Sequence, residues 1–300
     1  MYARALAVWG FGIVQSRELE RAGQRAFAEL CDVVAASTSV RLRPFVAQSH
    51  AELTHAIDDE EVALAWLPPI PTIELEAKNL ATVLAIPFRN ATMSYHCALI
   101  ARRGLRPKKD LSALIEDLRG IRAAWVEPTS AAGYLVPRMQ LAALGVDLGS
   151  FFAREIFTRS HPAVVEAIVS GQADVGATYC HVDRSKQVIR GAWLDEDGRA
   201  SRPIEVLTTF GPIPNDALVV SNLMPVTDRA ALTRWLLDST SPKRPSQPPT
   251  SESSPQRPAG PRVRELLAQL LGASDFRMPS AAHYDPLRHL LRTARVRGTR

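Results

Sequence analysis

The sequence predicts an α/β protein built from two lobes. Short β-rich runs alternate with amphipathic helical periods along most of the chain, a pattern typical of an α/β fold with mainly parallel sheets. A length of 300 residues is long for one domain and suits two lobes of about 100–150 residues each. Hydrophobic residues make up 46% of the chain, which is enough to form a packed core in each lobe.

The expected strands are short runs rich in β-branched and aromatic residues, bounded by turn residues. They cover residues 3–8, 40–47, 62–66, 82–87, 95–101, 122–126, 155–157, 173–178, 204–209 and 216–221. The expected helices have apolar residues at helical spacing. They cover residues 17–36, 51–57, 132–144, 162–170, 263–271 and 286–293. The glycines of the segment 9–12 are interpreted as a bend after the first strand.

The net charge of +5 is unevenly distributed. From residue 241 onward eleven lysines and arginines stand against four acidic residues, so the first 240 residues carry a net charge of about −2. The folded body is therefore not expected to bind nucleic acid. Residues 239–261 are rich in proline and serine and predict a disordered insertion. The arginine-rich C-terminal tail beyond it is interpreted as a solvated end.

No apolar run in the sequence is long enough to span a bilayer. The first residues lack a basic segment followed by a cleavage site, which argues against a secretory signal. The cysteines Cys31, Cys97 and Cys180 form no C-x-x-C pair and predict buried free thiols. As written, the sequence indicates a cytoplasmic protein; a true start codon further upstream would make it periplasmic.

The segment 125–136, WVEPTSAAGYLV, carries the strongest functional signal. A strand is expected to end at Val126 and a helix to begin near Ala131, next to the small residue Ala132. A helix N-terminus presents about four unpaired N–H donors and about half a positive charge, so it can bind an oxyanion. The alternative is that Thr129 or Ser130 simply caps the helix.

A second helix start is expected at 158–162, TRSHP, where Pro162 suits the first helical turn. His161 would then face the same end of the sheet as the first turn and could donate a hydrogen bond to an anion, with a rise in its pKa. A histidine at such a position can also be only part of a cap. Two such turns in one lobe favour a binding pocket over two independent caps.

Sequence patterns of enzymes are absent from the chain. It contains no phosphate-binding G-x-x-x-x-G-K-[ST], no dinucleotide-binding G-x-G-x-x-G after a strand, no H-E-x-x-H and no G-x-S-x-G. His181 and Asp183 are two potential metal ligands without a third at useful spacing. We therefore predict no catalytic residue, no cofactor and no metal site.

Six stretches, in this order, resemble the phosphate, phosphite and phosphonate-binding proteins of ABC importers, a branch of the type II periplasmic binding proteins. They are SHAELTHAIDDEEVALAWLPP (49–69), EPTSAAGYLVPRMQ (127–140), LGVDL (144–148), FTRSHPAVVEAIVSGQADVGATY (157–179), GPIPNDALVVS (211–221) and HYDPLR (283–288). The resemblance implies two lobes with mixed sheets flanked by helices, joined by two hinge crossings, that close on a ligand. Lobe one would comprise 1–93 plus 209–300, and lobe two 94–208.

The resemblance also implies a set of ligand-binding residues. They are Thr129, Ser130, Ala131, Ala132, His161, Tyr95, His50 and Asp216. Tyr179 is a further candidate for the pocket, because it directly follows the expected strand 173–178. Two departures from the family's pattern bear on the ligand. Ala131 and Ala132 stand where the family usually has hydroxyl residues, and His50 stands where it has a tyrosine, which predicts a more polar and pH-sensitive pocket.

The function predicted from these observations is the binding of a small oxyanion, as the substrate-binding component of an ABC-type importer. The expected partners are the oxyanion and an ABC permease or a regulatory protein, and the expected state is a monomer. Two alternatives stay open at the level of sequence. One is a cytoplasmic ligand-sensing protein, and the other is a cofactor-biosynthesis enzyme on the same fold.

Overall fold

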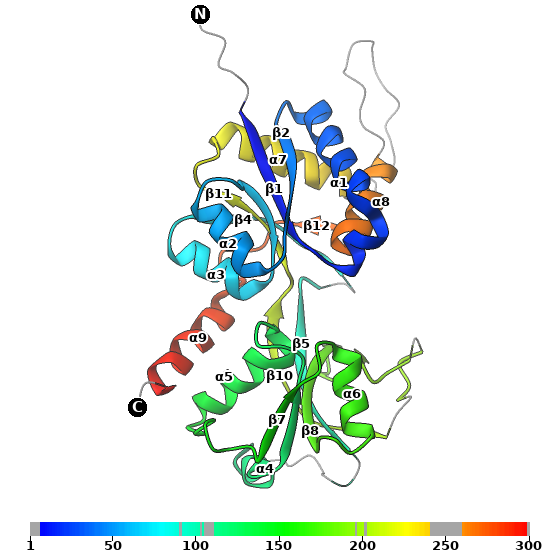
Figure 1. Ribbon diagram of the computed structural model, residues 1–300, viewed down its shortest axis with the longest axis vertical. Coiled ribbons are helices and arrows are strands. Elements are labelled where there is room, and N and C mark those ends of the chain that lie inside the picture. The colour runs from blue at the N-terminus through cyan, green and yellow to red at the C-terminus, as the bar shows by residue number, and fades with distance from the viewer. Residues whose placement is uncertain are drawn as a thin grey trace, which may run out of the picture. The chain divides into compact units, whose positions relative to one another are not determined.

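The computed structural model describes residues 7–89, 92–102, 104, 111–195, 197–200, 203–240 and 260–298 (Figure 1). The chain divides into two compact units, a first unit of Met1–Met93 and Asn215–Ala281 and a second unit of Ser94–Pro214 and Ala282–Arg300. The division differs from the predicted one at both 209–214 and 282–300, which belong to the second unit. The chain therefore passes between the units three times, not twice.

The first unit is built on a mixed sheet with strand order β12-β4-β11-β3-β1-β2. Its strands are β1 (Val8–Val14), β2 (Arg41–Ala47), β3 (Leu64–Leu67), β4 (Ala81–Pro87), β11 (Ala217–Ser221) and β12 (Phe276–Arg277). Strand β1 pairs in parallel with β2 and β3, whereas β11 runs antiparallel to β3 and β4. Chain segments from both ends of the sequence thus complete one sheet.

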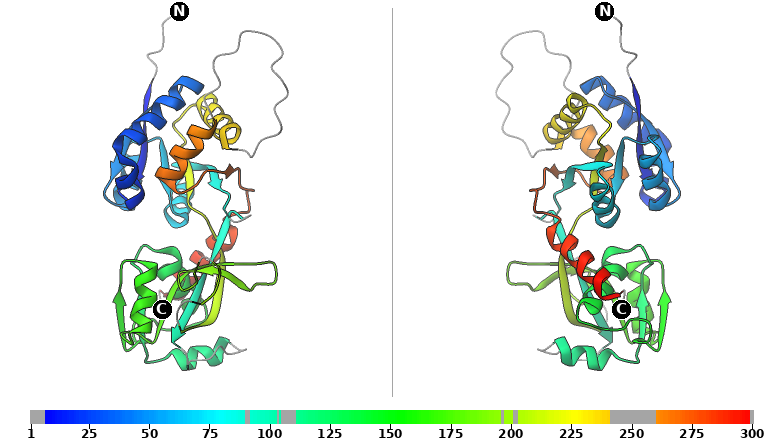
Figure 2. Two further views of the ribbon diagram at one scale, coloured as in Figure 1. Left: turned by 90° about the vertical axis from the view of Figure 1, so that its right-hand side faces the viewer. Right: turned by 90° about the vertical axis from the view of Figure 1, so that its left-hand side faces the viewer.

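Helices cover both faces of this sheet. They are α1 (Arg17–Thr38), α2 (His50–Asp58), α3 (Pro69–Ala77), α7 (Val226–Thr240) and α8 (Gly260–Leu271). Helices α1, α7 and α8 gather on one face around a core that includes Phe11 and Leu64 (Figure 2). On the other face α2 approaches closely because Gly12 has no side chain; a Cβ there would lie 2.3 Å from Leu53 Cδ1.

The second unit has its own mixed sheet, of order β10-β5-β8-β6-β7, with β9 paired to β8. Its strands are β5 (Ser94–Arg102), β6 (Arg122–Trp125), β7 (Arg154–Phe157), β8 (Val175–Val182), β9 (Val188–Gly191) and β10 (Ile204–Pro214). Strand β6 is parallel to β7 and β8, while β5 is antiparallel to β8 and β10. The parallel strands β6, β7 and β8 all end at the same edge of this sheet, and the candidate functional site lies there.

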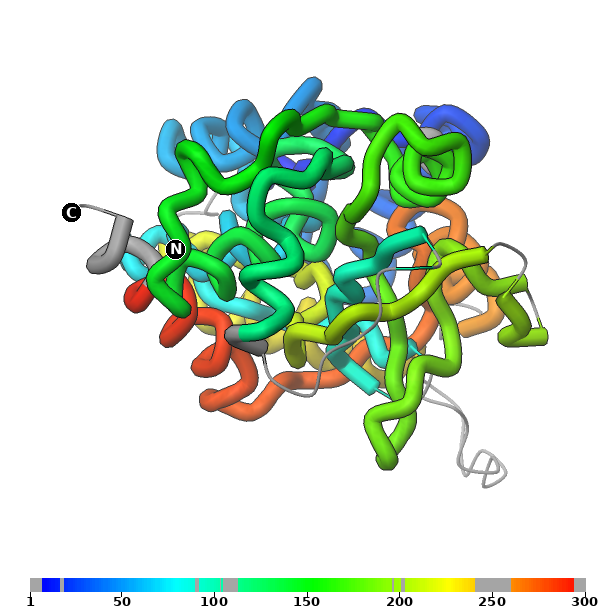
Figure 3. The backbone as a smooth tube through the Cα atoms, turned by 90° about the horizontal axis from the view of Figure 1, so that it is seen from below, coloured from blue at the N-terminus to red at the C-terminus, as the bar shows by residue number. Residues whose placement is uncertain are grey.

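The helices of the second unit are α4 (Leu111–Leu118), η1 (Ala131–Leu135), α5 (Val136–Ala143), α6 (His161–Val169) and α9 (Asp285–Gly298). The chain leaves β6 toward α5 and leaves β7 toward α6, on opposite faces of the sheet (Figure 1). Helix α9 runs beside α5 (Figure 3). This contact is the reason that the C-terminal segment belongs to the second unit.

The predicted α/β architecture is confirmed, with corrections in detail. The sheets are mixed, as the family resemblance implies, and not mainly parallel, as the strand–helix alternation alone predicts. The segment Trp9–Gly12, interpreted as a bend, lies inside β1, where a Cβ on Gly10 would come within 2.2 Å of the Glu61 carbonyl oxygen. Helices α3, α4 and α7 and strands β9 and β12 were not predicted. Most of the proline- and serine-rich insertion, residues 241–259, lies outside the described residues.

Two further expectations can be compared with the structure. Cys31, Cys97 and Cys180 are buried free thiols, as predicted, and burial raises the pKa of Cys31 and of Cys180 to about 12. Within the described ranges, no helix is long and apolar enough to cross a membrane.

Candidate functional site

The candidate site lies at the carboxyl edge of the second unit, the edge of its sheet where β6, β7 and β8 end. These three strands share one direction, so the loops that follow them emerge at the same edge. Strand β5 is antiparallel to β8 and therefore begins there. After β6 and after β7 the chain turns to opposite faces, which is the position where ligands bind in open α/β sheets.

The turn after β6 leads into η1 through a capped helix start. The Ser130 hydroxyl oxygen accepts a hydrogen bond from the Gly133 N–H at 3.1 Å, and the Ser130 carbonyl accepts one from the Leu135 N–H at 2.9 Å. Ser130 therefore does cap the helix, as the alternative interpretation held, and its own O–H remains able to donate. Thr129 is exposed at the turn.

The first two helical residues, Ala131 and Ala132, keep their N–H groups free. Neither N–H has a hydrogen-bond acceptor among the described residues, as expected for the first turn of a helix. Both side chains are buried, with Ala132 only 2% exposed. Gly133 fixes the tight path of the turn, because a Cβ there would lie 2.3 Å from Val126 Cγ2.

The turn after β7 is tied to the turn after β6 by backbone hydrogen bonds. The N–H of Thr158 donates to the Trp125 carbonyl at 2.8 Å, and the N–H of Arg159 donates to the Val126 carbonyl at 2.7 Å. Arg159 adopts a positive φ of 68°. Ser160 then caps α6 by accepting a hydrogen bond from the Ala163 N–H at 3.3 Å. The two helix starts are thus held side by side.

His161, the first residue of α6, is placed by β8. Its Nδ1 lies 3.0 Å from the Thr178 hydroxyl oxygen, and its ring meets the Tyr179 ring edge-on at a centroid distance of 5.0 Å. Burial lowers the pKa of His161 to about 4, so the imidazole is neutral near pH 7. The sequence predicts that contact with an anion raises the pKa of His161. Burial in the protein acts in the opposite direction and lowers this pKa.

Tyr95 lies at the same edge, near the start of β5. It is half-buried and pairs in register with Ile213 of β10. Next to it, His96 was not predicted as a site residue, and burial lowers its pKa. Thr178 was missed as well, although it is the polar residue in the otherwise small and apolar run VGAT of 175–178. That contrast was the signal that could have identified it.

The remaining predicted residues, His50 and Asp216, belong to the first unit. His50 begins α2 at the carboxyl end of β2, and Asp216 precedes β11 beside the carboxyl end of β3. Both lie at the carboxyl edge of the first unit's sheet, in which strands β2 and β11 are three strand spacings, or about 14 Å, apart. Burial raises the pKa of Asp216 to about 6 against the lowering influence of Arg89.

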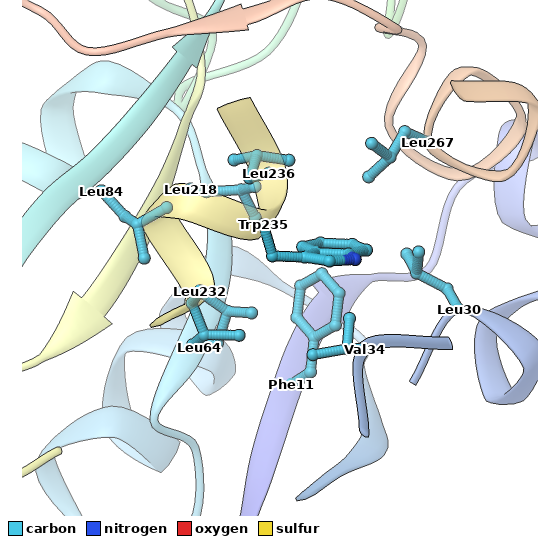
Figure 4. A pocket seen from close by; sticks show the side chains of 10 residues that line it. All are labelled: Phe11, Leu30, Val34, Leu64, Leu84, Leu218, Leu232, Trp235, Leu236 and Leu267. Carbon is cyan, nitrogen blue, oxygen red and sulfur yellow. The ribbon is translucent and has the colours of Figure 1, made fainter. Parts of the chain in front are cut away.

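A separate apolar pocket occurs inside the first unit (Figure 4). Its lining side chains come from the sheet and from α1, α7 and α8: Phe11, Leu30, Val34, Leu64, Leu84, Leu218, Leu232, Trp235, Leu236 and Leu267. Such a lining cannot compensate the lost hydration of an oxyanion, so we interpret the pocket as part of the core. Across the described part of the chain, no group of three or more His, Cys, Asp or Glu side chains could hold a metal ion.

Residues 12–284 match the family model described as ABC transporter, phosphonate, periplasmic substrate-binding protein. The chain belongs to this family. The family consists of substrate-binding transport proteins and not of enzymes, so the chain is a substrate-binding protein of the phosphonate ABC transporter type.

Solved structures support the fold. A Xanthomonas citri protein bound to ATP is 19% identical, with a TM-score of 0.70 over 97% of this chain and 98% of that one. A binding protein component of an ABC phosphonate transporter from Pseudomonas aeruginosa is 18% identical, with a TM-score of 0.62 over 97% and 87%. PhnD1 from Prochlorococcus marinus, in complex with methylphosphonate, is 14% identical, with a TM-score of 0.63 over 96% and 98%. The fold is that of the type II periplasmic binding proteins.

Proposed function

We propose that the chain binds a small oxyanion (phosphate, phosphite or a phosphonate) at the carboxyl edge of the second unit. One observation carries the proposal: the free N–H groups of Ala131 and Ala132 and the neutral imidazole of His161 belong to two helix starts that are bonded to each other. Donors fixed in this way stabilise an anion without the reorganisation that water would require. Thr129, Ser130, Tyr95 and Tyr179 are the further ligand contacts that we propose in this unit.

The charges around the helix starts support the same ligand class. No acidic residue lies in the first turn of η1, of α5 or of α6. The positive ends of these helices are therefore not neutralised by a carboxylate of their own first turn. Ala131 and Ala132 offer backbone donors but no hydroxyl. Each missing hydroxyl removes a potential hydrogen bond worth about 0.5–1.5 kcal/mol, and we infer a ligand affinity set mainly by backbone donors and His161.

We further propose that His50 and Asp216 of the first unit take part in ligand recognition, and that the ligand-bound form is recognised by an ABC permease. Asp216 would recognise a hydrogen-bond donor or an amine on the ligand, since a carboxyl group can accept or share a proton. The proposed place of action is the periplasm, which is where this family works.

The test is calorimetric titration of ligand-free protein with phosphate, phosphite, methylphosphonate, aminoethylphosphonate and sulfate. ATP is added to this panel because one structurally similar protein was solved with it. We expect micromolar or tighter binding of at least one phosphorus oxyanion. His161→Ala should weaken that binding about 10- to 100-fold, the range for a lost hydrogen bond to a charged group.

His289→Ala is the matched control, because His289 is an exposed histidine on α9 of the same unit. It should leave the affinity unchanged. Equal affinities for His161→Ala and the wild-type protein would contradict the site assignment. If the wild-type protein binds none of the phosphorus oxyanions in the titrations, the proposed ligand class is contradicted.

A further inference from the structure

The side chain of Thr178 has one evident hydrogen-bond partner, the imidazole of His161. The hydroxyl oxygen lies 3.0 Å from His161 Nδ1, and Thr178 is fully buried within β8. Among the residues that the structure describes, no other group accepts a hydrogen bond from this hydroxyl. A hydroxyl carries one proton, and burying that proton without an acceptor is costly.

Two proton arrangements are compatible with the distance. In one, the Thr178 hydroxyl donates to Nδ1, and the ring proton resides on Nε2. In the other, Nδ1–H donates to the hydroxyl oxygen, and the hydroxyl proton has no acceptor in the described surroundings. Only the first arrangement satisfies both groups. Because burial keeps the imidazole neutral, with a pKa of about 4, a single ring nitrogen carries a proton.

The orientation of the ring is fixed from a second side. The Tyr179 ring meets the imidazole at an interplanar angle of 88°, in an edge-on contact. The next residue along α6, Pro162, lies in the first helical turn, where its missing N–H costs no intrahelical hydrogen bond. In the described part of the chain His161 Nε2 has no hydrogen-bond partner, so this nitrogen is left for a ligand.

We propose that Thr178 is a positioning residue that locks His161 as the Nε2–H tautomer and so presents one neutral donor to the oxyanion. This inference rests on the proposed function and refines its specificity. A neutral Nε2–H can donate but cannot accept, and it donates its strongest hydrogen bond to a charged, unprotonated ligand oxygen. His161 therefore favours a deprotonated P–O oxygen over a P–OH group at that position.

The test compares the full-length wild-type protein with Thr178→Val and Thr178→Ser. Valine has the shape of threonine without its hydroxyl, and serine keeps the hydroxyl. Long-range ¹H–¹⁵N correlation spectra of the ligand-free protein report which imidazole nitrogen is protonated. The wild-type protein and Thr178→Ser should show His161 protonated at Nε2 alone, whereas Thr178→Val should show a mixture of both tautomers.

Methylphosphonate titration gives the second readout. Thr178→Val should bind about 3- to 10-fold more weakly, because one hydrogen bond that orders the donor is lost and only part of the population is binding-competent. A wild-type spectrum with Nδ1 protonated would overturn the inference, even if Thr178→Val did not fold. An unchanged tautomer in Thr178→Val would overturn it as well.

The spectra also separate this inference from the proposed function. They require no ligand, so a wild-type protein with Nε2 protonated that fails to bind any phosphorus oxyanion would defeat the proposed function alone. Binding by a wild-type protein with Nδ1 protonated would instead support the site and defeat the role of Thr178.

Discussion

The carboxyl edges of the two units are built alike and charged differently. In each, parallel strands end at one edge and lead into helix starts, of which α2 in the first unit and η1 and α6 in the second are capped by a serine. In the first unit, however, Glu52 lies in the first turn of α2 and accepts a hydrogen bond from the Gln48 N–H at 2.7 Å. In the second unit the first turns of η1, α5 and α6 contain no acidic residue.

This difference teaches how one architecture can supply two kinds of edge. A carboxylate in the first helical turn satisfies the positive end of the helix from within the protein. Without such a carboxylate the same backbone geometry remains available to an external anion. The first unit adds Asp216, a carboxyl with a raised pKa, whereas the second adds the neutral donor His161. This contrast supports our proposal that the second unit binds the anion.

The largest expected effect comes from giving the second unit the kind of carboxylate that the first already has. Ser130→Asp should keep the helix cap, since aspartate caps as well as serine, but it places a negative charge beside the proposed ligand. Repulsion at about 4–5 Å corresponds to about 3–4 kcal/mol at an effective dielectric constant of about 20. Affinity for methylphosphonate, measured by calorimetry, should fall at least about 100-fold.

Ser130→Asn is the matched control for this change, because asparagine caps without charge. It should stay within about 5-fold of the wild-type affinity, as expected for a lost or altered neutral hydrogen bond. If the aspartate variant binds as well as the asparagine variant, the comparison between the two edges fails.

A smaller effect is expected at the glycine that shapes the second unit's edge. Gly133→Ala forces a methyl group to within 2.3 Å of Val126 Cγ2 and 2.7 Å of Ser130 Oγ, so the turn must shift. The free energy of unfolding should fall by about 1–3 kcal/mol, with weaker oxyanion binding. Denaturant unfolding measures the first effect. Gly149→Ala, whose Cβ would lie 3.4 Å from its nearest neighbour, should be nearly neutral.

The first unit's edge is tested by Asp216 and pH. Its pKa is about 6 in the folded state and about 3.9 in an unfolded chain. The folded protein therefore keeps the Asp216 carboxyl protonated up to a higher pH than the unfolded chain does. Stability should therefore fall as pH rises from about 4 to 6 and stay lower above that. Asp216→Asn should raise the free energy of unfolding by about 1 kcal/mol at pH 8, allowing for partial exposure, and leave it unchanged at pH 4.

The opposite result, a variant no more stable than the wild-type protein at pH 8, would mean that ionised Asp216 is already compensated. The edge of the first unit would then, like that of the second, carry no uncompensated negative charge, and the contrast between the two edges would be weaker.

The smallest effect is expected from the capping glutamate. Glu52→Gln removes the charge from the first turn of α2 while keeping a hydrogen-bond acceptor for the Gln48 N–H. The free energy of unfolding should decrease by about 0.3–1 kcal/mol, more at low salt than at high salt. Thermal unfolding at two salt concentrations measures this. A variant that is more stable than the wild-type protein would contradict the role given to Glu52.

Much of the fold could be predicted from the sequence, because it depends on local periodicity. The strand and helix around 122–144 were found because an apolar run, a proline turn and a helical period follow one another. Strand direction was predicted less well: β11 joins the first sheet from a distant part of the sequence and runs antiparallel to β3, a pairing that no local pattern reveals. Trp9–Gly12 was misinterpreted because its glycines serve close packing within a strand.

The candidate site could be predicted in part for the same reason. The helix starts at Ser130 and Ser160 are local features with local signals. The partnership between His161 and Thr178 joins residues of α6 and β8, and it depends on which strands are neighbours. The raised pKa of Asp216 and the lowered pKa of His161 arise from burial by the folded chain, so the sequence alone could not give them.

The most direct test of the central claim, that the second unit's carboxyl edge binds the anion, is an NMR titration of the wild-type protein with methylphosphonate. We predict that the backbone amide signals of Ala131 and Ala132 and the Nε2–H signal of His161 shift together and saturate at a common concentration. The amides of the Ser49–Glu52 cap in the first unit, where a carboxylate is already present, should shift less. Saturable shifts centred on that cap, with none at Ala131, Ala132 or His161, would contradict the account.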